Sequence, residues 1–381
     1  TDLFEGLWPI TQVGVSYNAY VVRDERRAVI DLAKSLKADE FFDQIAEVTD
    51  LRALDYIILN HMEPDHTGVL RTLLRIAPQA TILGSEKTKA MLESFYGVTE
   101  QVQAVQDGET LPLGRRTLQF FATPFVHWPE TIMTYEGSQR VLFSCDGFGG
   151  YGALQGAIFD DQCVDQGYYE REALRYYVNI VAKFSRPVLR AIEKLAAVPV
   201  EVIAPSHGLV WRKDPGRIVE LYRRWAGYAT GPTEPGVTLV YGSMYGHTEK
   251  MMNAVAQGVS GEKVPLEIFD INHTHVSFIL PALWTRSGVA IGAPTYEGGL
   301  FPPMVHLLDM AERKGIRNKK VARFGSYGWS GGAQREFEAL IGKLGWKLVD
   351  SFEFVGAPTE EELRRGVEFG AALARAVKES P

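Results

Sequence analysis

A regular alternation of strand-like and helix-like segments fills the chain from residue 237 to its end. Short apolar runs bounded by glycine are each followed by a segment whose apolar residues recur at helical spacing. We expect strands at 237–242, 265–271, 287–293, 319–325 and 347–355, and helices at 247–259, 275–283, 302–313, 332–344 and 359–378. This pattern predicts an α/β fold with a doubly wound parallel five-stranded sheet, whose ligand crevice lies at the carboxyl ends of the strands.

The segment Gly227–Gly236 separates this region from the rest of the chain. It contains Pro232 and Pro235 among glycines and small polar residues, which continue neither a helix nor a central strand. We therefore predict two domains, 1–233 and 234–381. The first is less regular and predicts a mixed α/β domain, with strands at 17–23, 27–32, 54–60, 80–84, 117–122, 131–135 and 140–144 and helices at 38–48, 68–76, 168–196 and 215–225.

Charge and composition exclude several classes of function. The net charge of −7 comes entirely from residues 1–236, and the remainder is neutral, so no basic footprint for nucleic acid is present. No apolar run is long enough to span a membrane. Two cysteines without a CxxC motif form no disulfide framework, and the acidic start differs from a secretory signal. We expect a cytoplasmic protein.

Four metal-competent side chains follow the apolar run 54–60 within six residues: His61, Glu63, Asp65 and His66. Alternation in an extended loop directs the first three to one side, and His66 follows where the chain turns into a helix. The alternative is a solvated polar loop in which Asp65 or Thr67 caps a helix.

Three further residues favour the metal site over that alternative. His127 follows the strand-like run 117–122, Asp146 follows the apolar run 141–145 and His207 follows Val202-Ile203, each beside glycine or proline. Imidazoles mixed with carboxylates suit iron or manganese, but imidazole also suits zinc, so ligand type leaves the metal open.

The order HxExDH, His, Asp, His resembles the metallo-β-lactamase superfamily, which implies an αββα sandwich. Glu63 stands where the zinc hydrolases carry a histidine, and in this the chain resembles the flavodiiron proteins along nearly its whole length. The resemblance implies that one iron takes His61, Glu63 and His127. It implies that a second iron takes Asp65, His66 and His207, with Asp146 bridging the pair and no catalytic residue beyond these ligands.

Glycine-rich and hydroxyl-bearing loops follow three strands of the second domain. The first leads into a helix, whose free N–H groups and positive end bind phosphate without a cation. The alternative is an ordinary strand–helix turn. The three loops resemble those of flavodoxins, which implies FMN. The candidate FMN contacts are Ser243, Met244, Tyr245, Gly246, His247, Thr248, Pro294, Thr295, Tyr296, Glu297, Gly298, Ser326, Tyr327, Gly328, Trp329, Ser330 and Gly331.

The resemblance further implies an oxidoreductase that reduces O2 to water, NO to N2O, or both, at a di-iron site that receives electrons from FMN. It implies a head-to-tail homodimer, or a dimer of such dimers. It also implies an external electron donor such as rubredoxin or reduced coenzyme F420. Two alternatives remain: a di-zinc hydrolase fused to a flavodoxin domain, and an electron carrier with a relic first domain.

The densest basic run, Arg313–Lys320, has two interpretations. It is either a solvated helix end whose cations suit the helix dipole, or a docking patch for an acidic electron carrier that includes Lys319 and Lys320.

Overall fold

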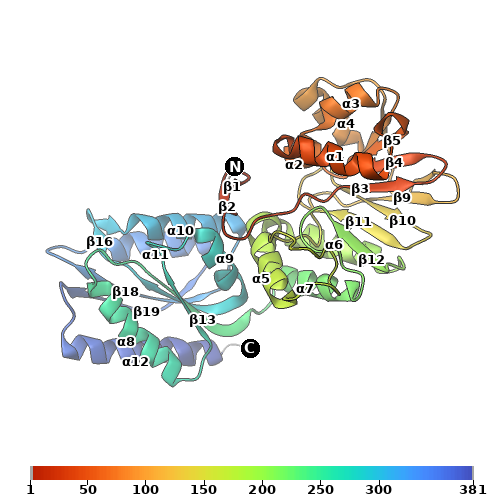
Figure 1. The fold of residues 1–381 in the computed structure, drawn as a ribbon. Helices are drawn as coiled ribbons and strands as arrows, with labels where there is room; N and C mark the ends of the chain where they lie inside the picture. The colour runs from red at the N-terminus through yellow and green to blue at the C-terminus, as the bar shows by residue number, and fades with distance from the viewer. Residues whose placement is uncertain (1–2, 380–381) are drawn as a thin grey trace. The chain divides into compact units, whose positions relative to one another are not determined.

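The computed structural model describes residues 3–379, so Thr1 and Asp2 at the acidic start lie outside the described residues. The chain forms two compact units that divide between Ala226 and Gly227 (Figure 1). This division lies at the beginning of the predicted linker, and the domain boundary at residue 233 stays a prediction.

The first sheet of unit 1 has the strand order β3-β4-β5-β6-β7. Its first pair is antiparallel and the others are parallel. The strands are β3 (Tyr20–Arg23), β4 (Arg27–Ile30), β5 (Tyr56–Ile58), β6 (Thr81–Gly84) and β7 (Val102–Ala104).

The second sheet of unit 1 has the order β12-β11-β10-β9-β8, and only the β11–β12 pair is parallel. Its strands are β8 (Thr110–Pro112), β9 (Thr117–Ala122), β10 (Ile132–Glu136), β11 (Val141–Cys145) and β12 (Val202–Pro205). A short hairpin, β1 (Leu3–Phe4) with β2 (Trp8–Pro9), precedes both sheets.

Helices cover the outer faces of the two sheets (Figure 1). The first sheet carries α1 (Ala38–Val48), α2 (Pro64–Thr67), α3 (Leu70–Ile76) and α4 (Glu86–Tyr96), with the 3₁₀ turns η1 (Ser35–Lys37) and η2 (Leu51–Ala53). The second carries α5 (Gln166–Tyr176), α6 (Ser185–Leu195) and α7 (Pro215–Gly227). One apolar core fills the space between the sheets, where Ile58 of β5 and Phe120 of β9 are buried. The predicted αββα sandwich is confirmed.

The predicted helix 168–196 is interrupted. The π-helical turn η3 (Tyr177–Val181) and the 3₁₀ turn η4 (Ala182–Phe184) separate α5 from α6. At the interruption, the Asn179 side chain donates to the carbonyl of Arg175 and so competes with the backbone ladder. The helix α4 was not predicted; more than half of its residues are polar or charged.

Unit 2 contains a parallel sheet of order β14-β13-β15-β18-β19, as predicted for a doubly wound fold. Its strands are β13 (Glu234–Tyr241), β14 (Leu266–Asp270), β15 (Arg286–Gly292), β18 (Lys320–Tyr327) and β19 (Lys347–Val355), and a two-residue ladder joins β16 (Thr295–Tyr296) to β17 (Gly299–Leu300). Helices α8 (His247–Gly261) and α12 (Glu360–Lys378) cover one face, and α9 (Val276–Thr285), α10 (Pro302–Lys314) and α11 (Ala333–Leu344) cover the other (Figure 1).

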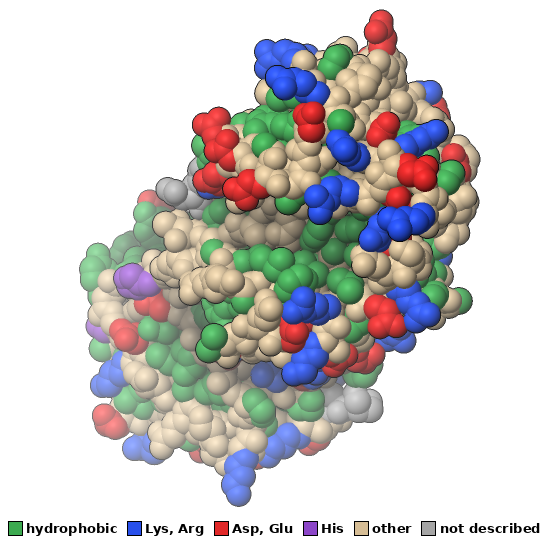
Figure 2. All heavy atoms as spheres, turned by 45° about the vertical axis from the view of Figure 1, so that its right-hand side comes forward, with side chains coloured by type: hydrophobic (Ala, Val, Ile, Leu, Met, Phe, Trp, Pro, Cys, Tyr) green, Lys and Arg blue, Asp and Glu red, His purple; other side chains and the backbone are tan. Residues whose placement is uncertain are grey.

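The surface carries charges of both signs. On the face drawn in Figure 2, Lys and Arg side chains are interspersed with Asp and Glu side chains and form no broad field of one sign. No helix among residues 3–379 is long and apolar enough to cross a bilayer.

Candidate metal centre and cofactor loops

The structure brings all seven predicted metal ligands of unit 1 into one buried cluster. They lie on four segments that each follow a strand. The segment after β5 contributes four of them, and the segments after β9, β11 and β12 contribute one each; in chain order they are His61, Glu63, Asp65, His66, His127, Asp146 and His207.

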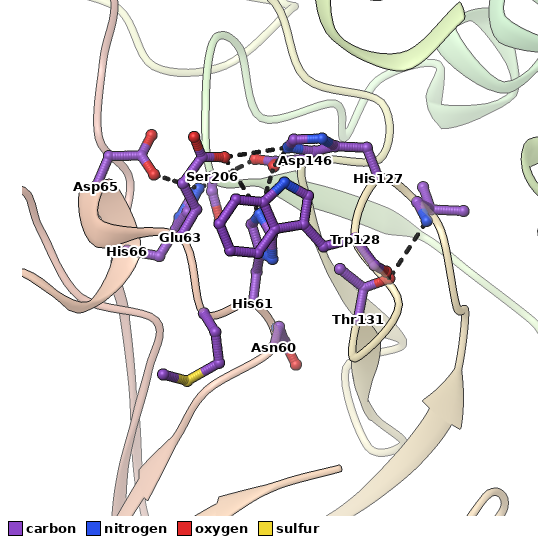
Figure 3. Close-up of polar contacts among 12 residues, drawn as sticks. Asn60, His61, Glu63, Asp65, His66, His127, Trp128, Thr131, Asp146 and Ser206 are labelled. Carbon is purple, nitrogen blue, oxygen red and sulfur yellow. Dashed lines mark hydrogen bonds and ion pairs between the residues drawn. The ribbon is translucent and has the colours of Figure 1, made fainter. Parts of the chain in front are cut away.

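One group of donor atoms consists of the side chains of His61, Glu63 and His127 together with one oxygen of Asp146. The Oε2 atom of Glu63 lies 3.3 Å from Nε2 of His61 and 3.1 Å from Nε2 of His127. The Oδ2 atom of Asp146 lies 3.5 Å and 3.1 Å from the same two nitrogens. Figure 3 shows these side chains pointing toward one another.

The other group consists of Asp65, His66 and His207, and it faces the second oxygen of Asp146. The carboxylate of Asp65 lies 3.3 Å from Nε2 of each histidine. The Oδ1 atom of Asp146 lies 3.2 Å from Nε2 of His66 and 3.3 Å from Nε2 of His207. The two oxygens of one buried carboxylate therefore face two separate sets of ligands.

These distances fit two metal ions better than a network of hydrogen bonds. Two atoms bound to one ion at about 2.1 Å, at angles from tetrahedral to octahedral, are roughly 3.0–3.4 Å apart. Several of the donor atoms are also buried without a hydrogen-bond partner in the described part of the chain: both oxygens of Asp65, Oδ1 of Asp146, and Nε2 of His66 and His207. Buried polar atoms need partners, and cations would supply them here.

Protonation of the histidines balances the carboxylates when no cation is bound. Burial disfavours the charged imidazoles, but hydrogen bonds to Asp146 and Glu63 raise the pKa of His127 to about 9. Burial likewise disfavours the charged imidazole of His207, but the neighbouring carboxylates of Asp146 and Asp65 outweigh this effect and raise its pKa to about 10. The cluster is therefore built for compensating positive charge, and binding of metal ions would release these protons.

Supporting residues around the cluster were missed by the sequence prediction. Glu130 is buried and accepts hydrogen bonds from Nδ1 of His61, at 2.6 Å, and from the backbone N–H of Met62, at 2.9 Å. Asp31, also buried, accepts from the backbone N–H of Asn60 and the hydroxyl of Ser206, the residues immediately before His61 and His207. Glu130 stands three residues after His127, and this proximity was the available signal.

Cys145 is another neighbour of the cluster, since its sulfur lies within 4.8 Å of ligand atoms of His66 and Asp146. Cys145 is buried, whereas Cys163 is only half-buried.

Aromatic rings enclose both ligand groups. The Trp128 ring meets that of His61 edge-on with centroids 5.0 Å apart. The rings of Phe4, Tyr17 and Tyr176 lie 5.3, 5.5 and 5.6 Å from that of His207. This apolar wall limits access of water to the centre.

In unit 2, the three predicted cofactor loops follow β13, β15 and β18, which are adjacent in the sheet. Gly246 has a φ of 87° directly before α8, a conformation that glycine adopts without strain. Its N–H donates to the hydroxyl of Ser243. The rings of Tyr245 and Trp329 are 85% and 95% exposed, so neither is part of the core.

These loops also contact one another. The hydroxyls of Thr248 and Ser326 lie 3.1 Å apart and join the first turn of α8 to the end of β18. A Cβ at Gly332 would lie 2.1 Å from the carbonyl oxygen of Gly298, so the segments after β15 and β18 also approach each other, through backbone alone. The structure thus gathers the candidate contacts at one edge of the sheet.

The docking hypothesis for Arg313–Lys320 is wrong for Lys319. This side chain is 2% exposed and donates to the carbonyls of Trp284 and Arg286. Arg313 and Lys314 lie in the last turn of α10, which agrees with the helix-end interpretation. Lys320 begins β18, at the strand end opposite the cofactor loops, and the seven steps to Tyr327 span about 23 Å.

The comparisons with known proteins agree with both units. The ODP family of beta lactamases matches residues 15–208, and the flavodoxin family matches residues 239–370. The fold and the ligand cluster thus define a two-domain protein in which a lactamase-like unit with a dinuclear metal cluster is joined to a flavodoxin-like unit.

Whole-chain relatives specify the family. A nitric oxide reductase from Moorella thermoacetica is 31% identical over 96% of this chain and 91% of its own. The rubredoxin oxygen:oxidoreductase from Desulfovibrio gigas superposes with a TM-score of 0.92 at 30% identity, covering 98% of this chain and 94% of its own. A variant of the flavo di-iron protein from Thermotoga maritima superposes with a TM-score of 0.89 at 30% identity, covering 99% of this chain and 93% of its own. The chain belongs to the flavodiiron protein family.

Proposed function

We propose that this chain is a flavodiiron oxidoreductase that reduces O2 to water, NO to N2O, or both, with His61, Glu63 and His127 on one iron and Asp65, His66 and His207 on the other. The observation that carries the proposal is the position of Asp146, whose two oxygens face the two ligand groups at 3.1–3.5 Å. A bridging carboxylate keeps two cations close together and offsets their repulsion.

Two irons and one FMN together store the four electrons that convert O2, with four protons, to two waters; two electrons and two protons convert two NO to N2O and water. The residues of unit 1 hold the ions in place. Glu130 fixes the orientation of the His61 ring, and Asp31 fixes the segments before His61 and His207. The rings of Trp128 and Tyr176 keep water from the centre.

The residues of unit 2 would hold FMN at the carboxyl ends of β13, β15 and β18. Backbone N–H groups at the start of α8 and the hydroxyls of Ser243 and Thr248 suit the phosphate. The exposed rings of Tyr296 and Trp329 suit the two sides of a planar ring system. The remaining predicted contacts belong to the same three loops.

The electron donor and the assembly are part of the proposal. We propose an external donor such as rubredoxin or reduced F420, and a head-to-tail homodimer in which the FMN of one protomer serves the iron centre of the other. The exposed Tyr245 and Trp329 rings support a partner surface at the cofactor loops, because isolated surfaces seldom expose such large apolar rings together. A fully active monomer in gel filtration would contradict the dimer.

The experiment that tests the function is a measurement of metal and flavin content followed by stopped-flow mixing of the reduced protein with O2 and, separately, with NO. We expect about two irons and one FMN per chain and rapid reoxidation by at least one gas. Asp146→Ala should lose metal and both activities but retain flavin. Asp107→Ala, an exposed aspartate of the same unit that pairs with Lys194, is the matched control.

The di-zinc hydrolase is the outcome that would replace this proposal. It would appear as two zincs per chain, esterase activity and no reoxidation beyond that of free flavin. The carboxylate of Glu63 among the first group of ligands and the complete flavodoxin-like unit both favour the oxidoreductase.

A further inference from the structure

Arg323 is a charged side chain in the interior of unit 2. It lies in β18, the strand that leads into the third cofactor loop, and it is 0% exposed. Removing a guanidinium from water is unfavourable unless its hydrogen bonds and charge are well matched. A fully buried arginine in a strand therefore needs a reason.

The contacts of Arg323 lead to three different segments. Its Nη2 atom donates to the carbonyl of Ala293, at 3.2 Å. Its Nη1 atom donates to Oε1 of Gln334, at 3.0 Å, and to Oε1 of Glu353, at 2.9 Å. Its Nε atom has no hydrogen-bond partner within residues 3–379. Glu353 lies on β19, and its side chain remains 21% exposed.

Each of these partners adjoins a cofactor loop. Ala293 immediately precedes the loop Pro294–Gly298, and Gln334 lies in the first turn of α11, three residues after the end of the loop Ser326–Gly331. The other carboxylate oxygen of Glu353 lies 3.1 Å from the position that a Cβ on Gly331 would occupy. The guanidinium thus connects the base of one loop with both ends of the other.

Close backbone packing at the same place makes the loop positions sensitive to this connection. A Cβ at Gly325 would lie 2.0 Å from the carbonyl oxygen of Ala293 and 2.9 Å from Nη2 of Arg323. The Ala293 carbonyl that accepts from Arg323 is therefore in close contact with β18. The planar guanidinium fork of arginine can bond to this carbonyl and to two side chains at once. A lysine offers a point charge in place of this fork.

We propose that Arg323 is a positioning residue for the flavin: it fixes the two loops that flank the FMN ring and places a buried positive charge beneath them. This inference rests on the proposed FMN site. The charge of a buried cation near a flavin favours the reduced, anionic ring over the neutral oxidised one, which raises the reduction potential. Because Glu353 is partly exposed, water screens its compensating charge more than that of Arg323.

Two effects can then be separated by substitution. Arg323→Met removes both the fork and the charge, so it should weaken FMN binding about tenfold or more and lower the flavin potential. Arg323→Lys retains the charge but not the fork, and it should weaken FMN binding while the potential stays near that of the unsubstituted protein. Glu353→Gln leaves the cation uncompensated and should raise the potential.

The test uses the full chain. FMN dissociation constants are measured by quenching of flavin fluorescence on titration of the deflavinated protein, and potentials by spectroelectrochemical titration. Arg313→Met is the matched control, because Arg313 is an exposed arginine that also pairs with a carboxylate, that of Asp309. Thermal unfolding of each variant tests whether it is folded.

Opposite shifts of the potential in Arg323→Met and Glu353→Gln support the proposal. Unchanged FMN affinity and potential in folded Arg323→Met would overturn it, and so would shifts of the same sign in both variants, which indicate a merely structural effect. If Arg323→Met does not fold, weaker FMN binding in Arg323→Lys together with a raised potential in Glu353→Gln supports the proposal. Unchanged FMN affinity in Arg323→Lys, or an unchanged or lowered potential in Glu353→Gln, would then overturn it. Failure of the unsubstituted protein to bind FMN would instead contradict the proposed function.

Discussion

The Nδ1 atom of His61 donates a 2.6 Å hydrogen bond to the buried carboxylate of Glu130, while Nε2 of the same ring faces Glu63 and Asp146. A ring that is held at one nitrogen presents the other to a metal in a fixed direction, and the partner carboxylate makes that nitrogen a stronger ligand. The His61–Glu130 pair therefore links β10, through the segment before it, to the metal centre.

We expect Glu130→Gln to lower the affinity of the centre for iron about 10- to 100-fold with FMN retained. Competition with a chelator, followed by elemental analysis, measures this change. Glu136→Gln is the control, because Glu136 is a buried glutamate on β10 that bonds to Ser138 and Gln139 away from the cluster. Equal iron retention in the two variants would contradict the role of Glu130.

The division of ligands into two groups predicts different losses of metal. His127→Ala removes a ligand of the first group, and His207→Ala one of the second, so each should lower the metal content to about one ion per chain. Asp146→Ala should lower it further, because both groups share this residue. Elemental analysis checks this order, and equal losses in all three variants would show that the two groups do not bind separately.

Trp329 is predicted to contribute to flavin binding without contributing to folding. Its ring is almost fully exposed, so Trp329→Ala should leave the melting temperature unchanged. Loss of stacking should weaken FMN binding roughly 2- to 10-fold. Calorimetry and a flavin titration measure the two quantities. Trp346→Ala is the contrast, because the buried Trp346 donates to the carbonyl of Ile316 and its loss should destabilise unit 2. An unchanged FMN affinity in Trp329→Ala would exclude this ring from the site.

The burial of Lys319 leads us to expect that the stability of the protein depends on pH. Burial lowers the pKa of its ammonium group from 10.5 to about 7. Between these values the unfolded chain binds more protons than the folded one, so the free energy of unfolding rises with pH, by at most about 1.4 kcal/mol per unit. The penalty is complete below pH 7 and disappears above 10.5.

Urea unfolding of the full chain at pH 7 and pH 9 tests this contribution. Lys319→Met should reduce the rise in stability between the two values, whereas Lys320→Met, a change of the same kind at the neighbouring, partly exposed residue, should retain it. An equal rise in both variants would show that Lys319 is not the group responsible.

Local patterns in the sequence predicted the elements and the ligand types. The five strands of the parallel sheet and the five helices of unit 2 were predicted within about three residues, because glycine-bounded apolar runs and helical periodicity are properties of neighbouring residues. The two-residue strands β16 and β17 were not predicted. His61, His127, Asp146 and His207 were found because each follows an apolar strand.

Only the tertiary structure decided which of these residues meet. Strand order and packing between segments far apart in the chain bring Asp146 between both ligand groups and Glu130 against His61. They also bury Lys319 and Arg323. The sequence pattern around a charged strand residue does not show whether its side chain faces water or a buried carbonyl, because its partners come from other strands and loops. The sequence by itself therefore determined the kinds of element and ligand, and the fold determined their pairing.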